Sequence, residues 1–556
     1  MWKFIQSLSG AASEEVTMGD QKPGQQVPAS EDQVCNSAGG YVWPVSDMNR
    51  LRRFMVLGTE GGTYYIQSKD LGLENIDCIQ KLIDDGLGEE VVKEIVKFSV
   101  EGRAAKQNPI MLALVQCARC TDMKTKKAAY DALSKVCRIP THLFQFIEYS
   151  EKFSEGTGWG RAQRRAISRW YNNKKPNDLA YQITKYRKRN GWTHRDVLRL
   201  AHVKPENDAT SLVLKYIAKG KKALLEEFGK IEEPNDRQKS VMMLLRAVED
   251  AKVSDDQTEI MTLIEEHNLV REHIPTKFLK EKDIWRSLLQ QMPMTAMIRN
   301  LGKMSSIELL APLSDEANLV CERLQSDERL KKARIHPFSI LLAYKTYKAK
   351  KGDKGKLTWE PEQTVLNALD DAFYKSFKFV EPTGKRFLLA VDVSGSMSCS
   401  GVNGARNVTA REAAAAMTMV TMRTEKRHHL VAFSNRLVDI PINEKMRMDE
   451  VIRICSNIPM GATDCAQPMI YARQKKISVD VFIIYTDCET WAGNIQPAEA
   501  LRSYRKETGI DAKLIVVAMT SNGFTLADPK DAGMMDIVGF DAAAPDVIRN
   551  FALGLL

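Results

Sequence analysis

The spacing of apolar residues changes near residue 380, and this change constrains the fold more than any other feature of the sequence. From about Asp77 to Ser376, apolar residues recur at every third or fourth position, as in EEVVKEIVKFSVEG and EIMTLIEEHNLVREH, which is the period of an amphipathic helix. After EPTGKR (381–386), apolar runs of strand length alternate with helical stretches: FLLAVDVS, HHLVAFS, VDVFIIYTD and KLIVVAMT. Because these runs are almost continuously apolar, they are typical of a parallel sheet covered by helices on both faces. The sequence therefore predicts a mostly α chain with a C-terminal, doubly wound α/β domain.

The helical part is expected to form an array of stacked helix pairs. Its segments are ten to sixteen residues long, and short breaks containing Pro, Gly, Asn or Asp separate them. This pattern favours antiparallel pairs in a HEAT-like array, with an irregular bundle as the alternative. The first forty residues are polar and rich in Gly, Gln, Ser and Pro. We therefore predict a disordered N-terminal extension (1–40), a helical domain (41–380) and the α/β domain (386–556).

Positive charge is concentrated in one part of the helical domain. Residues 101–200 contain 21 Lys plus Arg against 8 Asp plus Glu, a net charge of +13, whereas the whole chain carries +9. A concentrated basic surface on a nearly neutral body is typical of proteins that bind a phosphate backbone, because each neutralised phosphate releases condensed counterions. The sequence therefore predicts a polyanionic partner, and RNA is the interpretation we pursue.

Two basic segments in this window supply the candidate contacts. The first is a predicted helix, Gly160–Tyr171, in which arginines repeat four residues apart; like charges at this spacing repel, so they imply either an external anion or a solvated face. The second is KYRKR (185–189), followed by a helix for which Thr193 and Asp196 form a capping box. That cap places His194 and Arg195 in the first helical turn, where free backbone N–H groups favour phosphate. A structural role is the alternative for His194. The predicted RNA contacts are Arg161, Arg164, Arg165, Lys185, Arg187, Lys188, Arg189, His194, Arg195 and Arg199.

Polar side chains in the α/β domain predict a metal site. In an open parallel sheet, binding residues gather beyond the carboxyl ends of the strands. The first strand leads directly into Asp392, Ser394 and Ser396, Thr463 lies in a later loop, and Asp487 ends the strand VDVFIIYTD. Two carboxylates and three hydroxyls form an oxygen-only ligand set that suits Mg²⁺ or Mn²⁺, with water or a partner's carboxylate completing the coordination.

The sequence argues against an enzyme, a membrane protein and a secreted protein. It contains no P-loop, no H-E-x-x-H and no G-x-S-x-G motif. A phosphatase that used Asp392 as its nucleophile would need a second acid two residues later, but that position is Ser394. No apolar run approaches the length of a membrane span. The start, MWKFIQSLSG, lacks the apolar core of a signal peptide, and ten scattered cysteines suit a reducing compartment. We expect the protein in the cytoplasm and nucleus.

These residues also carry a resemblance to known families. DVSGS, with Thr463 and Asp487, resembles the metal-ion-dependent adhesion site of von Willebrand factor A-type domains, over roughly residues 386–556. Five upstream segments resemble the TROVE module of Ro and of telomerase- and vault-associated proteins: RLRRFMVLGTEGGTYYI (50–66), CRIPTHLF (137–144), RNGWTHRDVLRLAH (189–202), RNLGKM (299–304) and ARIHPF (333–338). Together the two modules resemble the Ro (SS-A) ribonucleoprotein autoantigens.

The resemblance implies a function as well as a fold. It implies a closed ring of HEAT-like helices that binds small non-coding Y RNAs on its outer basic surface and the 3′ ends of misfolded RNAs through its central hole, in RNA quality control. It also implies a monomer within a ribonucleoprotein, and a role in Y RNA binding for His194. Lys126, Lys127 and Lys135 are the candidates for the hole. The competing hypothesis is a protein-binding scaffold that recruits partners through the metal site.

Overall fold

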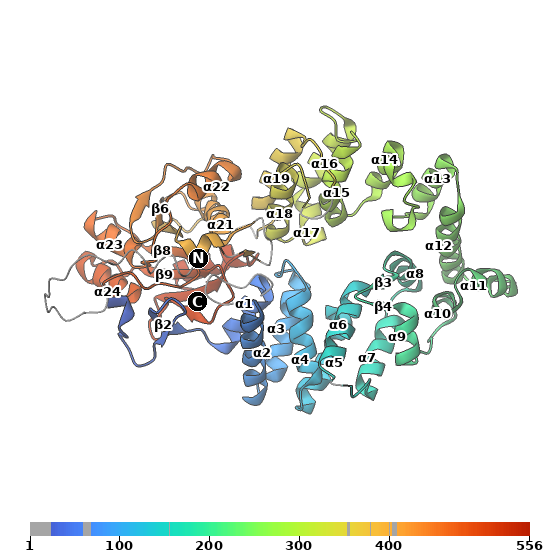
Figure 1. Ribbon diagram of the computed structural model, residues 1–556, viewed down its shortest axis with the longest axis horizontal. Helices are drawn as coiled ribbons and strands as arrows, with labels where there is room; N and C mark the ends of the chain where they lie inside the picture. Colours follow the sequence, from blue (N-terminus) through green and yellow to red (C-terminus); the bar gives the residue numbers. More distant parts are fainter. Residues whose placement is uncertain are drawn as a thin grey trace, which may run out of the picture.

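The computed structural model describes residues 24–58, 68–154, 156–352, 356–377, 380–399, 401–402 and 408–556. A helical array runs from α1 to α19, and a domain built on one sheet follows it (Figure 1). The last helix of the array ends at Lys375 and the first strand of the sheet begins at Phe387, on either side of the predicted change of period. No helix in the described ranges is long and apolar enough to span a membrane.

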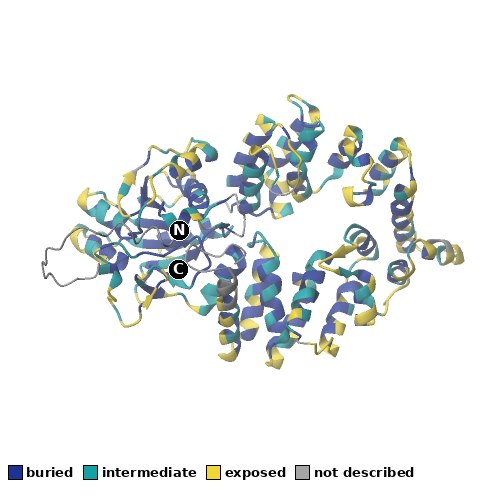
Figure 2. Cartoon of the chain, viewed as in Figure 1, coloured by how far each residue is buried: buried dark blue, intermediate teal, exposed yellow. Residues whose placement is uncertain are grey.

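The described helices of the array pair with their neighbours along the chain. Its elements are α1 (Asp47–Leu57), α2 (Ser68–Asp84), α3 (Gly88–Glu101), α4 (Asn108–Arg119), α5 (Met123–Val136), α6 (Pro140–Lys152), α7 (Arg161–Asn172), α8 (Pro176–Lys185), the hairpin β3 (Lys188–Arg189) and β4 (Trp192–Thr193), α9 (His194–Ala201), α10 (Asp208–Lys219), α11 (Lys221–Glu226), α12 (Asp236–Val253), α13 (Gln257–His267), α14 (Lys282–Gln291), α15 (Met294–Ser306), α16 (Asp315–Gln325), α17 (Asp327–Ala333), α18 (Pro337–Lys348) and α19 (Gln363–Lys375). Figure 2 shows buried residues along the faces where these helices meet.

Local sequence signals account for many helix boundaries. The predicted capping box is present at the start of α9, where the Thr193 side chain accepts from the backbone N–H of Asp196 and the Asp196 carboxylate accepts from that of Thr193. Helices α4, α6, α8 and α18 have proline in their first turn, where the missing N–H has no intrahelical partner to lose. The predicted helix Gly160–Tyr171 is α7, shifted by one residue.

The array closes on itself. It runs from α1 to α9 along one side, turns at α10–α13 and returns through α14–α19 (Figure 1). Where the end of the array meets its beginning, Arg334 donates to the carbonyl oxygen of Val100 at 2.6 Å, and the Nε2 of His336 lies 2.9 Å from the carbonyl oxygen of Arg103. These contacts join the start of α18 to the end of α3. The fold is therefore the HEAT-like ring that we predicted, and not an irregular bundle.

The C-terminal domain is a six-stranded sheet with the strand order β11-β9-β8-β5-β6-β7. All neighbouring strands are parallel except the edge strand β7, which pairs antiparallel to β6 and was not predicted. The strands and helices of the domain are β5 (Phe387–Asp392), α20 (Gly395–Cys399), α21 (Ala410–Thr424), β6 (His428–Phe433), β7 (Leu437–Asp439), α22 (Met448–Ser456), α23 (Gln467–Gln474), β8 (Val481–Thr486), α24 (Pro497–Thr508), β9 (Lys513–Ala518), β10 (Phe524–Thr525), β11 (Met534–Val538) and α25 (Ala544–Leu553).

Both faces of this sheet are covered, as the apolar strands predicted. Leu389 and the other strand residues on the same face of the sheet pack in one cluster with α21, α22 and α25. Leu388 and the residues that point the other way pack in a second cluster with α23 and α24. The first cluster continues without a break into the core of the ring. The domain is therefore doubly wound, and one of its helical layers is shared with the array.

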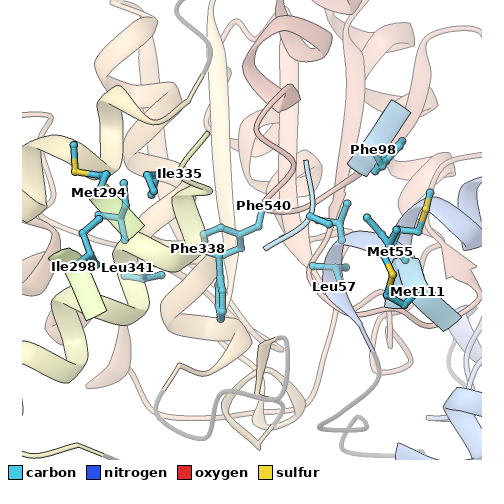
Figure 3. Packing of buried hydrophobic residues seen from close by; sticks show 14 of the residues in the cluster. Met55, Leu57, Phe98, Met111, Met294, Ile298, Ile335, Phe338, Leu341 and Phe540 are labelled. Atoms are coloured by element: carbon cyan, nitrogen blue, oxygen red, sulfur yellow. The ribbon is translucent and has the colours of Figure 1, made fainter. Parts of the chain in front are cut away.

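One aromatic contact lies at the junction of the ring and the domain. Phe540, which is fully buried, meets Phe338 edge to face with ring centroids 5.5 Å apart. Figure 3 shows this pair between Met55 and Leu57 on one side and Leu341 on the other. Beside it, the Nε of Arg103 donates to the Oδ1 of Asp541 at 2.9 Å. The C-terminal domain therefore packs across the seam at which the ring closes.

The prediction that residues 1–40 are disordered is wrong for residues 24–40; residues 1–23 lie outside the described residues. The segment from Gly24 lies along the C-terminal domain, and its strands β1 (Val34–Cys35) and β2 (Tyr41–Pro44) form a three-stranded sheet with β10 (Figure 1). Low hydrophobicity suggested disorder, but this segment is held by hydrogen bonds from buried polar side chains such as Gln25 and Asn36.

Candidate metal centre and basic surface

The five residues predicted as metal ligands meet at one end of the sheet. Asp392 ends β5, and Ser394 and Ser396 lie at the turn into α20. Asp487 directly follows β8, and the Thr463 loop is joined to the first loop by a hydrogen bond from Gly395 N to the carbonyl oxygen of Gly461. Parallel strands bring their carboxyl ends to the same edge, so residues nearly one hundred positions apart come together there. All five side chains are buried.

Hydrogen bonds hold this cluster in shape. The Oδ1 of Asp392 accepts from the backbone N–H of Ser394 at 2.9 Å, and its Oδ2 accepts from the Thr486 hydroxyl at 2.6 Å. The hydroxyl oxygens of Ser394 and Ser396 are 3.2 Å apart. Thr486 is a positioning residue that the sequence did not reveal. A threonine at the end of a buried strand looks the same in the sequence whether or not its hydroxyl donates to a metal-binding carboxylate.

The cluster carries more negative charge than its surroundings compensate. Burial raises the pKa of Asp392. Burial, with repulsion from Asp392 and Glu489, raises the pKa of Asp487 well above its usual range. Burial also raises the pKa of Glu489 to about 7. Glu489 was missed in the sequence, although an acid two residues after Asp487 is a readable signal.

The arrangement fits a hard divalent cation. The Oδ2 of Asp487 is buried and has no hydrogen-bond partner in the described part of the chain, so one carboxylate oxygen is left for a ligand. Two carboxylates and three hydroxyls are ligands that suit Mg²⁺ and Mn²⁺. A bound cation would stabilise the ionised carboxylates against the burial that raises their pKa values, and would offset the repulsion between Asp487 and Asp392. No cluster of three or more His, Cys, Asp or Glu side chains with metal-binding geometry is found among the described residues, so hydroxyl oxygens must contribute to any site here.

The predicted RNA contacts lie on neighbouring elements: α7, the end of α8 with the β3–β4 hairpin that follows it, and α9. Helix α9 packs against α7, and the hairpin contacts α6. On α7, Ile167, Trp170 and Tyr171 are buried, which leaves the arginines facing outward. The exposed members of the predicted set are Arg161, Arg164, Arg165, Arg187, Lys188, Arg189, Arg195 and Arg199. Lys185 is partly buried, with its ammonium 5.3 Å from the Tyr186 ring.

These exposed cations share one electrostatic property. Among the described residues, none of the eight has a carboxylate within ion-pairing distance, whereas six of the eleven described arginines of the C-terminal domain do. Repulsion between such neighbours is unfavourable unless an anion or solvent screens it. The structure therefore places an uncompensated positive surface on one side of the ring.

The prediction that His194 contacts RNA directly is contradicted by its burial. Its side chain is 4% exposed; it packs against Phe144, and its Nδ1 lies 2.8 Å from the Tyr171 hydroxyl. Burial lowers the pKa of His194 to about 3, so the ring is neutral. The residue joins α9 to α7 and thereby positions the exposed arginines of both helices. A helix-start histidine gives no sequence signal that separates these two roles.

The three lysines predicted for the central hole lie on α5, which packs against α7. Lys127 pairs with Asp131 at 3.1 Å, and the same carboxylate binds Arg169 at 3.0 Å. Lys126 is partly buried and Lys135 is exposed. Their place at the hole stays a prediction.

A second basic region was missed in the sequence. Arg271, Arg299 and Lys303 line a pocket of about 470 Å³ whose apolar wall includes Trp359. Burial, with repulsion from Arg271 and Lys280, lowers the pKa of Lys303. The residues come from well-separated parts of the array, so only the segment RNLGKM, already noted for its resemblance, could have drawn attention to them.

Comparison with known proteins gives a consistent family. Residues 34–346 match the TROVE domain, and residues 386–552 match the Ro60 vWA domain. The chain is 38% identical to the RNA-binding protein RO60 of Caenorhabditis elegans, over 99% of this chain and 95% of that protein. It is 37% identical to the RNA-binding protein RO60 of Deinococcus radiodurans, over 94% and 96% of the two chains. The crystal structure of the Deinococcus radiodurans RO (RSR) protein superposes with a TM-score of 0.66 at 34% identity, covering 92% of this chain and 100% of that one. The chain therefore belongs to the Ro60 family of proteins that join a TROVE domain to a vWA domain.

Proposed function

We propose that this protein binds structured small non-coding RNA through the surface formed by α7, the β3–β4 hairpin and α9; its similarity to RNA-binding RO60 proteins supports RNA as the partner. The observation that carries the proposal is the set of eight exposed cations on these elements that have no carboxylate partner among the described residues. Lys185 and Arg189 also lie 5.3 and 5.9 Å from the ring of Tyr186, which could stack on an unpaired base. By resemblance, the RNA is of the Y RNA class.

We further propose that the closed ring accepts the single-stranded 3′ ends of misfolded non-coding RNAs, so that the protein acts in RNA quality control as a monomer within a ribonucleoprotein. The closure contacts at Arg103 and His336, and the basic pocket around Arg299 and Lys303, support this part. The protein acts by binding rather than by catalysis, in cytoplasm and nucleus. The cysteines are all free thiols, which suits those compartments.

The test is the salt dependence of RNA affinity. We expect Arg164→Gln with Arg165→Gln to weaken binding of a Y-type stem-loop RNA at least tenfold near 0.1 M salt and to reduce the slope of log affinity against log salt by about 1.8. Lys475→Gln with Lys476→Gln, two exposed lysines of the C-terminal domain, removes the same charge elsewhere and serves as the control. Equal effects of the two pairs would leave only a general charge effect and refute the placed site.

We also propose that Asp392, Ser394, Ser396, Thr463 and Asp487 bind Mg²⁺ or Mn²⁺. When bound, the ion supplies positive charge to the two carboxylates and an open coordination position. Isothermal titration with Mn²⁺ should detect one site that Asp392→Ala abolishes.

A second candidate function is recruitment of a protein partner through the open coordination position of the metal. It is favoured by Met460, which is 63% exposed three residues before Thr463. Partner retention that requires both the divalent ion and Met460 would establish it.

A further inference from the structure

The N-terminal segment lies against the loops that carry two of the proposed metal ligands. These loops are 461–466, with Thr463, and 487–495, with Asp487. Gln25 and Asn36 reach them from more than four hundred residues away in the sequence. We propose that residues 24–40 are a positioning element of the metal site, so that metal affinity depends on side chains of this segment. The inference rests on the proposed metal site.

Gln25 carries most of the connection. Its side chain is fully buried and forms four hydrogen bonds. The Nε2 donates to the Oδ1 of Asp464 at 2.6 Å and to the carbonyl oxygen of Ile495 at 2.9 Å. The Oε1 accepts from the Thr490 hydroxyl at 2.6 Å and from Gly493 N at 3.1 Å. One side chain therefore joins both loops, because Asp464 belongs to the first and the other three partners belong to the second.

The bonds of Gln25 continue to the ligand Thr463. The Thr490 hydroxyl accepts from the backbone N–H of Cys465 at 3.0 Å, and the carbonyl oxygen of Thr463 accepts from the N–H groups of Trp491 and Ala492 at 3.0 Å. Without Gln25, Asp464 keeps its bonds to Ala466 N and to the side chain of Gln467, the first residue of α23, but neither of those partners lies in the second loop. The hydrogen bonds between the loops that do not involve Gln25 remain, but the link is weakened, so the Thr463 hydroxyl is held less firmly relative to Asp487.

Asn36 and Gly40 add a second attachment. The Asn36 Nδ2 donates to the carbonyl oxygen of Thr490 at 2.8 Å, and Ala38 N donates to the Glu489 carboxylate at 3.2 Å. A Cβ at Gly40 would lie 1.9 Å from the carbonyl oxygen of Thr490, so glycine is required for this close approach. Groups that orient metal ligands from outside the coordination sphere typically change metal affinity by 10–100-fold when removed.

The test compares Gln25→Ala with Gln26→Ala in the full-length protein. Gln26 is the matched control, because the same side chain at the next position forms a single 3.4 Å hydrogen bond to Trp491 O. We expect Gln25→Ala to weaken Mn²⁺ binding about tenfold or more, measured by paramagnetic resonance of the free ion, while the control stays within twofold of the wild type. Asn36→Ala should act in the same direction.

A second measurement does not require metal. Cys465 and Cys488 are fully buried thiols in the two loops, so their alkylation rates in native protein report loosening of these loops. Both alkylation rates should rise in Gln25→Ala, while Cys137 in the array, also fully buried, keeps its rate.

A wild-type protein that binds no Mn²⁺ would overturn the proposed metal site and this inference with it. Wild type and Gln25→Ala with equal affinity would overturn the inference alone. Faster alkylation of all three thiols would indicate general destabilisation and also overturn it.

Discussion

Truncation of Phe540 should weaken the seam at which the ring and the C-terminal domain meet. The side chain is fully buried and contacts Phe338 edge to face. Burial of an aromatic side chain removes roughly 150–250 Å² of surface from contact with water. At about 25 cal/mol per Å² this burial stabilises the fold by about 4–6 kcal/mol, and an alanine at the same position retains a small part of that free energy. Measured losses for Phe→Ala in cores are about 3–5 kcal/mol. We expect Phe540→Ala to lower the free energy of unfolding by that amount.

The backbone at residue 540 offers an internal check. Its φ is +60°, in the left-handed region, where any side chain with a Cβ costs about 1–2 kcal/mol. Phe540→Ala keeps this strain and Phe540→Gly removes it. We therefore expect the glycine variant to be no less stable than the alanine variant, although it has one carbon fewer.

The assay is urea unfolding followed by tryptophan fluorescence, combined with small-angle scattering to detect an opened ring. Phe551→Ala, in α25, removes a buried ring outside the Phe338 contact and controls for cavity formation. It should destabilise the protein without changing the radius of gyration in native buffer. A loss below about 1 kcal/mol for Phe540→Ala, or equal ring opening by the two variants, would refute the reasoning.

Three further changes have expected outcomes. Arg53 is fully buried and pairs with Asp536; Arg53→Met leaves that carboxylate unpaired and should lower stability by about 3–5 kcal/mol in urea unfolding, while Asp536→Asn in the same chain should restore part of it. Burial lowers the pKa of His336 in the folded protein to about 4, whereas the same histidine in the unfolded chain has a pKa of about 6.5. Below about pH 6.5 the unfolded chain therefore binds more protons than the folded protein. Stability should therefore fall as the pH is lowered from about 6.5 towards 4, by about 2 kcal/mol at pH 5 from this group, and His336→Gln should reduce the slope of stability against pH. Mg²⁺ should raise the thermal midpoint of the wild type, and Asp487→Asn should abolish this rise while leaving the midpoint in chelator unchanged or higher, because the substitution also removes the repulsion from Asp392.

The sequence predicted those features that depend on local patterns. The period of apolar residues separated the helical array from the sheet, and the ends of predicted strands located Asp392 and Asp487 because the sheet rule depends only on strand direction. The capping box at Thr193 was readable because both of its residues lie within one turn.

The features that the sequence did not predict depend on distant contacts. The pairing of Trp43 with Thr525 joins strands almost the whole chain apart, and no local pattern marks a two-residue strand. The burial of His194 follows from Phe144 and Tyr171, which belong to other helices. The edge strand β7 has three residues, fewer than periodicity can detect.

The C-terminal domain is part of the closure of the ring and not an appendage to it. In a helical solenoid each unit contacts only its neighbours, so the first and last helices each leave one face without a partner. Here the domain contacts both ends: Arg53 of α1 donates to the carbonyl oxygens of Asn522 and Phe524, and Met448 N donates to the Asp370 carboxylate of α19 at 3.0 Å, beside the packing of Phe540 on Phe338 of α18. Asn522 in turn donates to the carbonyl oxygen of Asp487 at 2.6 Å. The loop that begins at the proposed metal ligand Asp487 is therefore anchored, through Asn522, to the first helix of the ring, and the geometry of one constrains the geometry of the other.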